Sequence, residues 1–596
     1  MIDFSHSLSL TGKRWQEKAC DTRLAFALSQ RLDEPEIVGR LLASRNITLE
    51  DAPHFLNPSL KNLLVDPSHL HDLTNALQRI VQAIKEKEKI CIFGDYDVDG
   101  ATSTALLYRY FKQIGIQVDF YIPDRLQEGY GPNIPALEKL HQSGVHLIIT
   151  VDCGTTSHEP LQMAKNIGLD VIVIDHHIGE PKLPSAIAIV NPNRLDQESP
   201  CQTLAAVGVS FLLLVALNRT LRQQGYFTSF PEPNLLQFLD LVALGTVCDV
   251  MPLQKLNRAF VTQGLKVMAQ RQNLGLKTLM DTAGLQEAPS AYHLGFMLGP
   301  RINAGGRVGK STHGVTLLTT EDPALAQQIS HELEIFNRER QAIEAEVLQE
   351  AQSQAAIEIN QSSILIVENT HWHPGVIGIV AGRLKDSYHR PTLVISFDEN
   401  GIGKGSGRSI TGIDLGSLIQ AARQSNLIIA GGGHAMAAGF TIEKSKLDLF
   451  KTFLNERIQA LNLDLVPRLT IDGYLSLSSA TPEFLQKLER LAPYGQGNPT
   501  PRFVFSNIRI LHAEIVGKNH IKCQIGTLEG NRLQAIAFKS YETPLGPALL
   551  NHSGRLFHIL GALKLDSWSG KDRVQLSIED ALFASETLPL KQASLL

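Results

Sequence analysis

Three carboxylates crowd into a short segment that directly follows an apolar run. Asp95, Asp97 and Asp99 come after ICIFG and before ATSTALL, which is typical of a helix. Carboxylates at this spacing repel one another, and a divalent cation with oxygen ligands relieves that repulsion. A solvated acidic turn is the plain alternative. An EF-hand loop is excluded, because its twelfth position is Leu106 rather than Glu and a strand precedes it.

Two more apolar runs end in residues that can bind metal. HLIITVD ends at Asp152, and DVIVID ends at Asp175, which His176 and His177 follow. Ligands of an open parallel sheet bind beyond the carboxyl ends of its strands, so these side chains should converge with the first cluster. Taken singly, Asp152 reads equally well as a helix cap and His177 as an ordinary loop histidine.

A fourth acidic position closes an apolar helical pattern. Asp249 ends the run FLDLVALGTVCDV, and a carboxylate buried there needs a partner. A structural hydrogen bond is one reading, and a fourth metal-ligand segment fits the pattern better.

The elements that must position these residues form an α/β fold. Nearly continuous apolar runs alternate with helical patterns from about residue 89 to 191, which predicts a doubly wound parallel sheet. A second helical block follows, and then a segment with almost no Gly or Pro predicts one long connecting helix. A second, smaller α/β domain comes next, and short strands with frequent turns predict a small C-terminal β-barrel.

These patterns divide the chain into five expected parts. They are an N-terminal segment (1–65), a catalytic domain (66–320), the connecting helix (321–358), the smaller α/β domain (359–464) and the barrel (465–596).

The bulk composition narrows the class of protein. The 596 residues exceed one hydrophobic core, and the net charge of −5 argues against coating nucleic acid with a general positive field. A nucleic acid must therefore bind in a local basic groove. Six cysteines without a CxxC pair suggest neither a disulfide framework nor a cysteine zinc site. No apolar run spans a bilayer and the start lacks a signal-peptide pattern, so we expect a cytoplasmic protein with no membrane contact.

The motifs, in order, resemble a known family. GDYDVDGATS, TVDCG, VIDHH and ALGTVCDVMPL resemble the series of the DHH phosphoesterases, and PDRLQEGYG, GPRINAGGR, GSGRS, GGGHAMAAGF and LAPYGQGNPTPRF resemble RecJ exonucleases. The likeness runs from about residue 65 to the end. It implies that the catalytic domain is a DHH domain, that the smaller domain is a DHH-associated domain and that the barrel is an OB-fold.

The resemblance also implies roles for single residues. Its metal ligands fall on Asp97, Asp99, Asp152, His176 and Asp249, with Asp152 bridging two ions, and its phosphate-contacting histidine falls on His177. Other DHH phosphatases carry His at the position of Phe93, and Asp95 is expected to replace that ligand directly or through a second contact.

This ligand set implies hydrolysis with two divalent metal ions. Mixed Asp and His ligands suit Mn²⁺ or Mg²⁺, and two ions ~3.5–4 Å apart can activate a shared water and neutralise the leaving oxygen. No covalent nucleophile is required.

Residues that bind the substrate are expected elsewhere in the motifs. Those resembling the pocket for a 5′ phosphate and the DNA backbone are Arg125, Arg301, Arg307, Ser406, Arg408 and His434. The glycines of Gly403–Gly407 are expected to form a loop whose N–H groups approach the same anion, or else a simple flexible loop. The barrel offers aromatic and basic candidates for stacking bases, although aromatics on alternating strands are more often core: Phe503, Phe505, Phe538, Trp568, Arg502, Lys518, Lys522 and Arg573.

The resulting hypothesis is an exonuclease that degrades single-stranded DNA 5′ to 3′ to 5′-mononucleotides in DNA repair and recombination. We expect a monomer that meets a single-strand-binding protein and a repair helicase. One alternative is a phosphodiesterase of short RNA or cyclic dinucleotides, which would not need the barrel. Another is a non-enzymatic DNA-binding scaffold, which would require lost ligands.

Overall fold

The computed structural model describes residues 2–3, 7–125, 127–359, 361–566, 573–584 and 588–589. The chain forms two compact units. The larger unit contains Met1–Gly299, Gly314–Ala326 and Pro467–Leu596, and the smaller contains Pro300–His313 and Gln327–Val466. No helix in the described ranges is long and apolar enough to cross a membrane.

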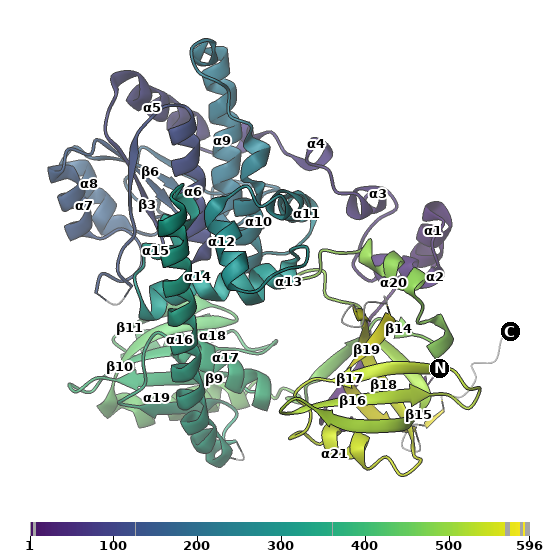
Figure 1. Ribbon diagram of the computed structural model, residues 1–596. Coiled ribbons are helices and arrows are strands. Elements are labelled where there is room, and N and C mark those ends of the chain that lie inside the picture. Colours follow the sequence, from purple (N-terminus) through teal and green to yellow (C-terminus); the bar gives the residue numbers. More distant parts are fainter. Residues whose placement is uncertain are drawn as a thin grey trace. The chain divides into compact units, whose positions relative to one another are not determined.

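The five expected strands of the catalytic domain form one parallel sheet. Its order is β4 (Val118–Tyr121), β3 (Ile90–Gly94), β5 (Leu147–Val151), β6 (Asp170–Ile174) and β7 (Ala188–Val190). Every neighbouring pair is parallel, and β3 and β5 are buried along their whole length. Helices cover both faces, as Figure 1 shows, so the predicted doubly wound fold is confirmed.

The helices of this domain include α5 (Leu73–Glu86), α6 (Val98–Gln113), α7 (Ile134–Gln142), α8 (His158–Asn166), α9 (Ala206–Gln223), α10 (Leu239–Cys248) and α11 (Lys255–Ala269). Helix α10 is apolar around its whole circumference, because it packs between α6, α9 and α11. Its first residue past the end is Asp249, so packing of α10 positions that carboxylate.

The smaller unit has its own five-stranded sheet. The order is β11 (Ala430–His434), β12 (Ala437–Glu443), β10 (Ile402–Arg408), β9 (Thr392–Phe397) and β8 (Leu365–Asn369). Helices α17 (Ile377–Tyr388), α18 (Leu415–Gln424) and α19 (Leu447–Gln459) belong to the same unit. The predicted connecting helix is α16 (Pro323–Glu358), 36 residues long.

The expected glycine loop at Gly403–Gly407 is wrong, because this segment is the strand β10. It pairs with β9 on one side and β12 on the other, so its backbone N–H groups are not available as an anion cradle. Gly403, Gly405 and Gly407 face the core, and a Cβ at Gly405 would lie 2.1 Å from Phe440 Cζ. The glycines make room for large core side chains. Their spacing of two residues is the signal for a strand.

The C-terminal strands close into a barrel. Strands β15 (Phe503–Val516), β16 (His520–Gly526), β17 (Arg532–Ala537), β19 (Arg573–Phe583) and β18 (Leu556–Asp566) pair in sequence, and β15 also pairs with β18. The predicted barrel is therefore confirmed. Phe503 and Phe505 are fully buried in its core, so they are not DNA-stacking residues. Trp568 lies outside the described residues.

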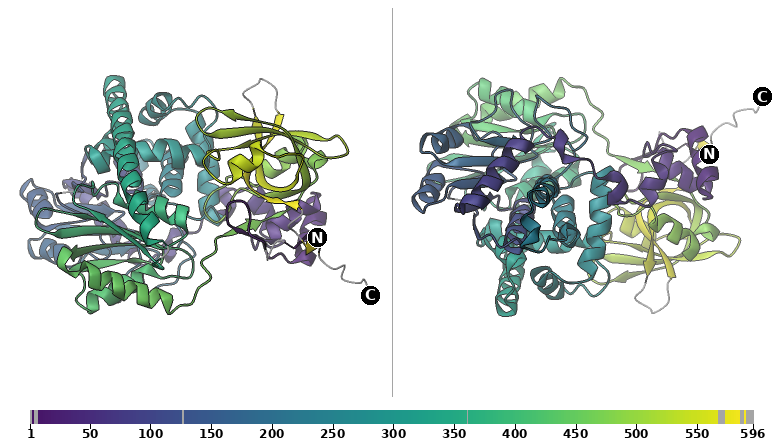
Figure 2. Two further views of the ribbon diagram at one scale, coloured as in Figure 1. Left: turned by 90° about the horizontal axis from the view of Figure 1, so that it is seen from below. Right: turned by 90° about the horizontal axis from the view of Figure 1, so that it is seen from above.

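The N-terminal segment packs onto this barrel domain. Strand β2 (Arg14–Glu17) pairs in parallel with β13 (Arg468–Ile471), and Trp15 Nε1 donates to Asp580 Oδ2 at 3.0 Å. Helices α1 (Thr22–Leu32) and α2 (Glu36–Ala43) share a hydrophobic core with the barrel and lie beside it in both views of Figure 2. Both ends of the sequence thus contribute to one core.

A buried arginine joins three parts of the larger unit. Arg258 on α11 is 1% exposed and donates to the carbonyls of Phe55, Leu491, Ala492 and Pro493. Its guanidinium also lies 3.9 Å from the centre of the Phe55 ring. The catalytic domain, the N-terminal segment and the segment leading into the barrel therefore meet on one side chain.

We expect Arg258→Met to destabilise the larger unit by on the order of 3 kcal/mol, because several buried carbonyls lose a charged donor. Chemical denaturation with a fluorescence readout measures the effect. Arg219→Met is the matched control, since Arg219 forms an exposed ion pair with Asp66 and should change stability by less than about 1 kcal/mol. Equal effects of the two substitutions would contradict the structural role of Arg258.

Candidate metal centre

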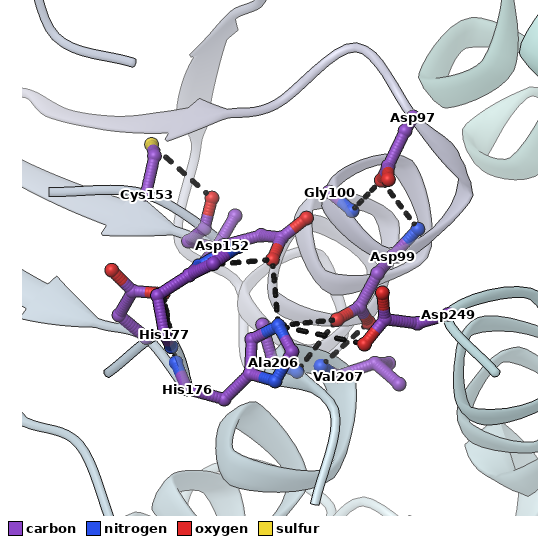
Figure 3. Close-up of polar contacts among 12 residues, drawn as sticks. Asp97, Asp99, Gly100, Asp152, Cys153, His176, His177, Ala206, Val207 and Asp249 are labelled. Carbon is purple, nitrogen blue, oxygen red and sulfur yellow. Dashed lines mark hydrogen bonds and ion pairs between the residues drawn. The ribbon is translucent and has the colours of Figure 1, made fainter. Parts of the chain in front are cut away.

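The carboxylates and histidines predicted from four separate motifs meet at the carboxyl end of the parallel sheet. Figure 3 shows Asp99, Asp152 and Asp249 pointing toward His176, while Asp97 points to the N–H groups of Asp99 and Gly100. His176 Nε2 lies 3.3 Å from Asp152 Oδ1, 3.5 Å from Asp249 Oδ2 and 3.8 Å from Asp99 Oδ2. The convergence expected from the sequence is present.

Backbone groups hold the first acidic motif in place. Asp97 caps helix α6, because its Oδ1 accepts from the N–H of Asp99 at 2.8 Å and of Gly100 at 3.1 Å. Asp99 in turn accepts from the N–H groups of Ala206 and Val207, at 2.6 and 3.0 Å. These two groups begin helix α9, whose N-terminal dipole favours a negative charge. No local sequence pattern indicates that α9 holds Asp99.

Asp152 sits in a backbone conformation that few residues adopt. Its φ is +62°, in the left-handed region, and Gly154 follows with a φ of +115°. Tyr130 Oη donates to the Asp152 carbonyl at 2.8 Å and lies 3.3 Å from His177 Nδ1. Strain of this kind persists where the surroundings enforce it, as at ligand sites.

Burial and the repulsion between carboxylates disfavour ionisation of the acidic side chains at this centre. Burial, and then neighbouring carboxylates, raise the pKa of Asp99 to about 7 and of Asp249 to about 9. The same causes, burial first, hold the pKa values of Asp95 and Asp152 well above their usual range. A cation bound among these groups would offset both costs.

The two adjacent histidines titrate in opposite directions. Burial and the positive charge of His177 lower the pKa of His176 to about 4, so its imidazole is neutral and able to bind metal. Burial also disfavours the charge on His177, but the 2.8 Å hydrogen bond to Asp175 and the negative charges of Asp175, Asp249 and Asp99 together outweigh burial and raise the pKa of His177 to about 9. The sequence placed Asp175 at this edge of the sheet, directly before both histidines in VIDHH, but no role was predicted for it.

The donor atoms fit a divalent metal. Asp95 Oδ1, His176 Nε2 and Asp249 Oδ2 are buried without a hydrogen-bond partner among the described residues. Two separate triads, Asp95–Asp97–Asp152 and Asp99–His176–Asp249, each bring their ligand atoms within 4.8 Å of one another. Oxygen and imidazole donors of this kind suit Mn²⁺ or Mg²⁺.

Phe93 and Asp95 differ in how they lie relative to the acidic centre. Phe93 is buried in the sheet and stacks on Tyr121, with ring centres 5.3 Å apart. Asp95 faces Asp97 and Asp152 in one of the triads. The expectation that Asp95 compensates for Phe93 is compatible with this placement and stays a prediction.

Three of the expected phosphate-binding residues gather in the smaller unit. Arg408 Nη1 lies 3.3 Å from Ser406 Oγ on β10, and a Cβ at Gly378 on α17 would lie 2.9 Å from Ser406 Oγ and 3.2 Å from Arg408 Nη2. Arg307 donates to the Gly375 carbonyl, just before α17, at 2.9 Å. The start of helix α17 therefore lies against this set. The glycines of HPGVIG, residues 373–378, are the sequence feature that could have indicated this contribution from the start of α17.

The other expected substrate contacts are placed differently. Arg301 pairs with Glu334 on α16 at 2.7 Å, which occupies part of its guanidinium. His434 is exposed at the end of the edge strand β11. Arg125 belongs to the larger unit, where its guanidinium lies 5.1 Å from the centre of the Tyr96 ring. Its role at a 5′ phosphate stays a prediction.

Comparison with known proteins agrees with this architecture. The DHH family, N-terminal domain, matches residues 89–246, the DHHA1 domain matches 361–460 and the RecJ OB domain matches 471–580. The fold and the acidic centre thus define a DHH-type phosphoesterase with an added OB domain.

Relatives that match over nearly all of this chain identify the family more narrowly. The single-stranded-DNA-specific exonuclease RecJ of Escherichia coli is 35% identical over 560 residues, covering 92% of this chain and 96% of the relative. That of Bacillus subtilis is 35% identical over 576 residues, covering 95% and 70%. The crystal structure of Thermus thermophilus RecJ in complex with Mn²⁺ matches with a TM-score of 0.80 and 28% identity, covering 96% of this chain and 79% of that one. The chain belongs to the RecJ family.

The raised pKa values predict that metal binding strengthens with pH. Asp99 and Asp249 must lose protons to bind a cation, so the increase in melting temperature caused by Mn²⁺ should be small at pH 6 and grow toward pH 9. The metal-free fold should show the opposite trend. Its carboxyls bind protons more tightly than the unfolded chain does, so its stability falls as pH rises from about 4 through these pKa values.

Differential scanning fluorimetry across this pH range, with and without Mn²⁺, provides the measurement. Asp249→Asn removes one titrating ligand and should flatten the pH dependence of the Mn²⁺ effect. A Mn²⁺ stabilisation of equal size at pH 6 and pH 9 would show that these carboxyls do not bind the metal.

Proposed function

We propose that this protein is a metal-dependent exonuclease that hydrolyses single-stranded DNA from its 5′ end to 5′-mononucleotides. The observation that carries the proposal is the convergence of Asp97, Asp99, Asp152, Asp249 and His176 at one edge of the sheet. The OB domain and the relatives named as single-stranded-DNA-specific exonucleases supply the substrate class. A phosphodiesterase of short RNA or cyclic dinucleotides has no such support.

Two divalent ions fit the ligand set best. Asp95, Asp97 and Asp152 would hold one ion, and Asp99, His176 and Asp249 the other, with Asp152 between them, since its Oδ1 lies 3.3 Å from His176 Nε2. Such ions, when bound, activate water for attack on phosphorus and neutralise charge on the leaving oxygen. The related structures with Mn²⁺ and with Mg²⁺ support both metals as candidates.

Two residues near the ions would serve the substrate phosphate. His177 is protonated at neutral pH because its hydrogen bond to Asp175 helps to raise its pKa. The protonated ring can donate a hydrogen bond to an oxygen of the scissile phosphate. Tyr130 Oη beside it keeps the ring in place. The nearby thiols are not nucleophiles, because burial holds the pKa of Cys153 and of Cys248 far above neutrality.

The direction of digestion would follow from an anchor for the terminal phosphate. Arg307, Ser406 and Arg408, with the N–H groups that begin α17, form a set suited to a phosphate dianion. If charge-assisted hydrogen bonds hold one end of the strand, the end that is bound sets the direction of digestion. A role in DNA repair and recombination, beside a single-strand-binding protein and a helicase, follows from such an activity.

Asp152→Ala should abolish measurable hydrolysis and reduce Mn²⁺ affinity, while the protein still binds single-stranded DNA through its other contacts. Nuclease assays, metal titration calorimetry and fluorescence anisotropy with labelled oligonucleotides test the three effects. Asp119→Ala, at an exposed position on β4, is the control and should leave all three unchanged. Turnover close to that of the parent enzyme would remove Asp152 from the metal centre.

Arg408→Ala should weaken the preference for a 5′-phosphorylated strand over a 5′-hydroxyl strand. The loss of one hydrogen bond to a charged group corresponds to ~1.5–3 kcal/mol in kcat/KM, or roughly 10- to 100-fold. Measuring both substrates with both proteins gives a double cycle. Lys404→Ala, on the same face of β10, should affect the two substrates alike. An unchanged preference would exclude Arg408 from the anchor, and efficient digestion from the 3′ end would overturn the proposed polarity.

A further inference from the structure

Two large aromatic side chains lie exposed on the catalytic domain. Tyr292 on α13 (Ala291–His293) is 62% exposed, and Phe296 on the adjoining π-helical turn η4 (Leu294–Leu298) is 72% exposed. Their rings stack with centres 5.1 Å apart and an interplanar angle of 26°. Together they form what we call the aromatic shelf. Exposed apolar surface of this kind usually marks a binding site.

The shelf lines a groove of about 920 Å³ within the larger unit. Its lining is mostly apolar and includes Val250, Met251, Tyr494 and Lys564. One wall comes from the catalytic domain. The other comes from the segment Ala492–Thr500 and from strand β18 of the barrel domain. The groove therefore joins the two domains that a bound strand must contact.

The wall that carries the shelf is continuous with the metal centre. Val247, Cys248 and Val250, which flank the metal-ligand candidate Asp249, all line the groove. Cys248 Sγ donates to the Leu294 carbonyl at 3.4 Å, so the turn bearing Phe296 packs directly on the end of α10. Val250 has a φ of +59° and is 63% exposed, an unfavourable conformation for a β-branched residue.

The barrel side of the groove contributes a cation, Lys564, which lies beside a second aromatic pair outside the lining. Lys564 Nζ lies 5.8 Å from the centre of the Phe538 ring, and Phe538 packs edge-on against His520 with centres 5.4 Å apart. Phe538 is half exposed on the barrel. An aromatic shelf on one wall and a lysine on the other suit a ligand that carries both flat aromatic groups and negative charges.

We propose that Tyr292 and Phe296 stack against unpaired bases of the strand as it leads to the metal centre, and that the groove selects single-stranded over paired DNA. This inference rests on the proposed function. Unpaired bases offer open π-faces to the shelf, whereas bases in a duplex are already stacked on one another. Lys564 faces the phosphates between them. Selectivity then arises from the bases themselves and adds to any recognition of the strand end.

The test compares strands with and without bases. The parent enzyme should have a KM for an oligothymidylate roughly 5- to 100-fold lower than for the same strand carrying an abasic stretch near its 5′ end. The double variant Tyr292→Ala/Phe296→Ala should raise KM for the normal strand by a similar factor and lose most of the abasic effect. The ratio of its activity on paired ends to its activity on single strands should also be higher than that of the parent enzyme.

Control variants separate stacking from folding. Tyr292→Phe and Phe296→Trp preserve flat rings and should restore the parent KM, and Phe26→Ala removes a 57% exposed aromatic outside the groove without effect. Because the substituted side chains are exposed and a small phosphodiester has no bases to stack on the shelf, hydrolysis of such a substrate should persist in every variant.

Two results would overturn the inference while leaving the nuclease assignment intact. They are a parent enzyme indifferent to removal of the bases, and a double variant that keeps the parent KM and discrimination. Failure of the parent enzyme to digest any single-stranded DNA would instead refute the proposed function itself. The measurement on the parent requires no variant, so it decides the matter even if a substitution impairs folding.

Discussion

The structure depends on the cost of burying several carboxylates in one place. Asp95, Asp99 and Asp152 are almost fully buried and lie against other carboxylates, and no arrangement of backbone donors offsets that repulsion completely. The protein supplies what it can, through the start of α9 at Asp99 and the cap of α6 at Asp97. Bound cations would offset the remaining repulsion, so the same burial of carboxylates that destabilises the metal-free fold would favour metal binding.

Asp175 lies beside the metal centre, but its pKa is shifted in the opposite direction from those of the carboxyls there. Asp175 is as buried as the metal ligands, yet its pKa is depressed, because His177 and the N–H groups of Thr155 and His176 bond to it. The histidine pair is thereby divided into a neutral ring and a cationic ring. Two adjacent residues of one type can then serve metal and phosphate separately, since environment rather than residue type sets their protonation.

The larger unit is held together by long-range contacts that differ in kind from those of the metal centre. Arg258 on α11 donates to carbonyls from two other parts of the chain, Phe55 and the segment from Leu491 to Pro493. Arg45 donates to the Asn498 side chain and to the Pro499 carbonyl just beyond that segment. Most of their acceptors are backbone carbonyls, although Arg45 also lies 3.7 Å from the Asp472 carboxylate. The segment they hold, LAPYGQGNP, also forms one wall of the groove with the aromatic shelf. Anchoring of the barrel and shaping of that groove therefore depend on the same buried side chains.

Local pattern by itself determined the parallel sheet, the long helix α16, the barrel and the convergence of the acidic motifs. Each follows from periodicity or from the rule that parallel strands present their carboxyl ends at one edge. Only the tertiary structure decided that β10 is an interior strand, because its glycines leave room for the side chains of Phe397 and Phe440 on the neighbouring strands. It alone decided that Trp15 packs with the barrel, that α9 holds Asp99 and that Arg258 is a buried hub. These features join residues far apart in sequence, and no local periodicity encodes such partners.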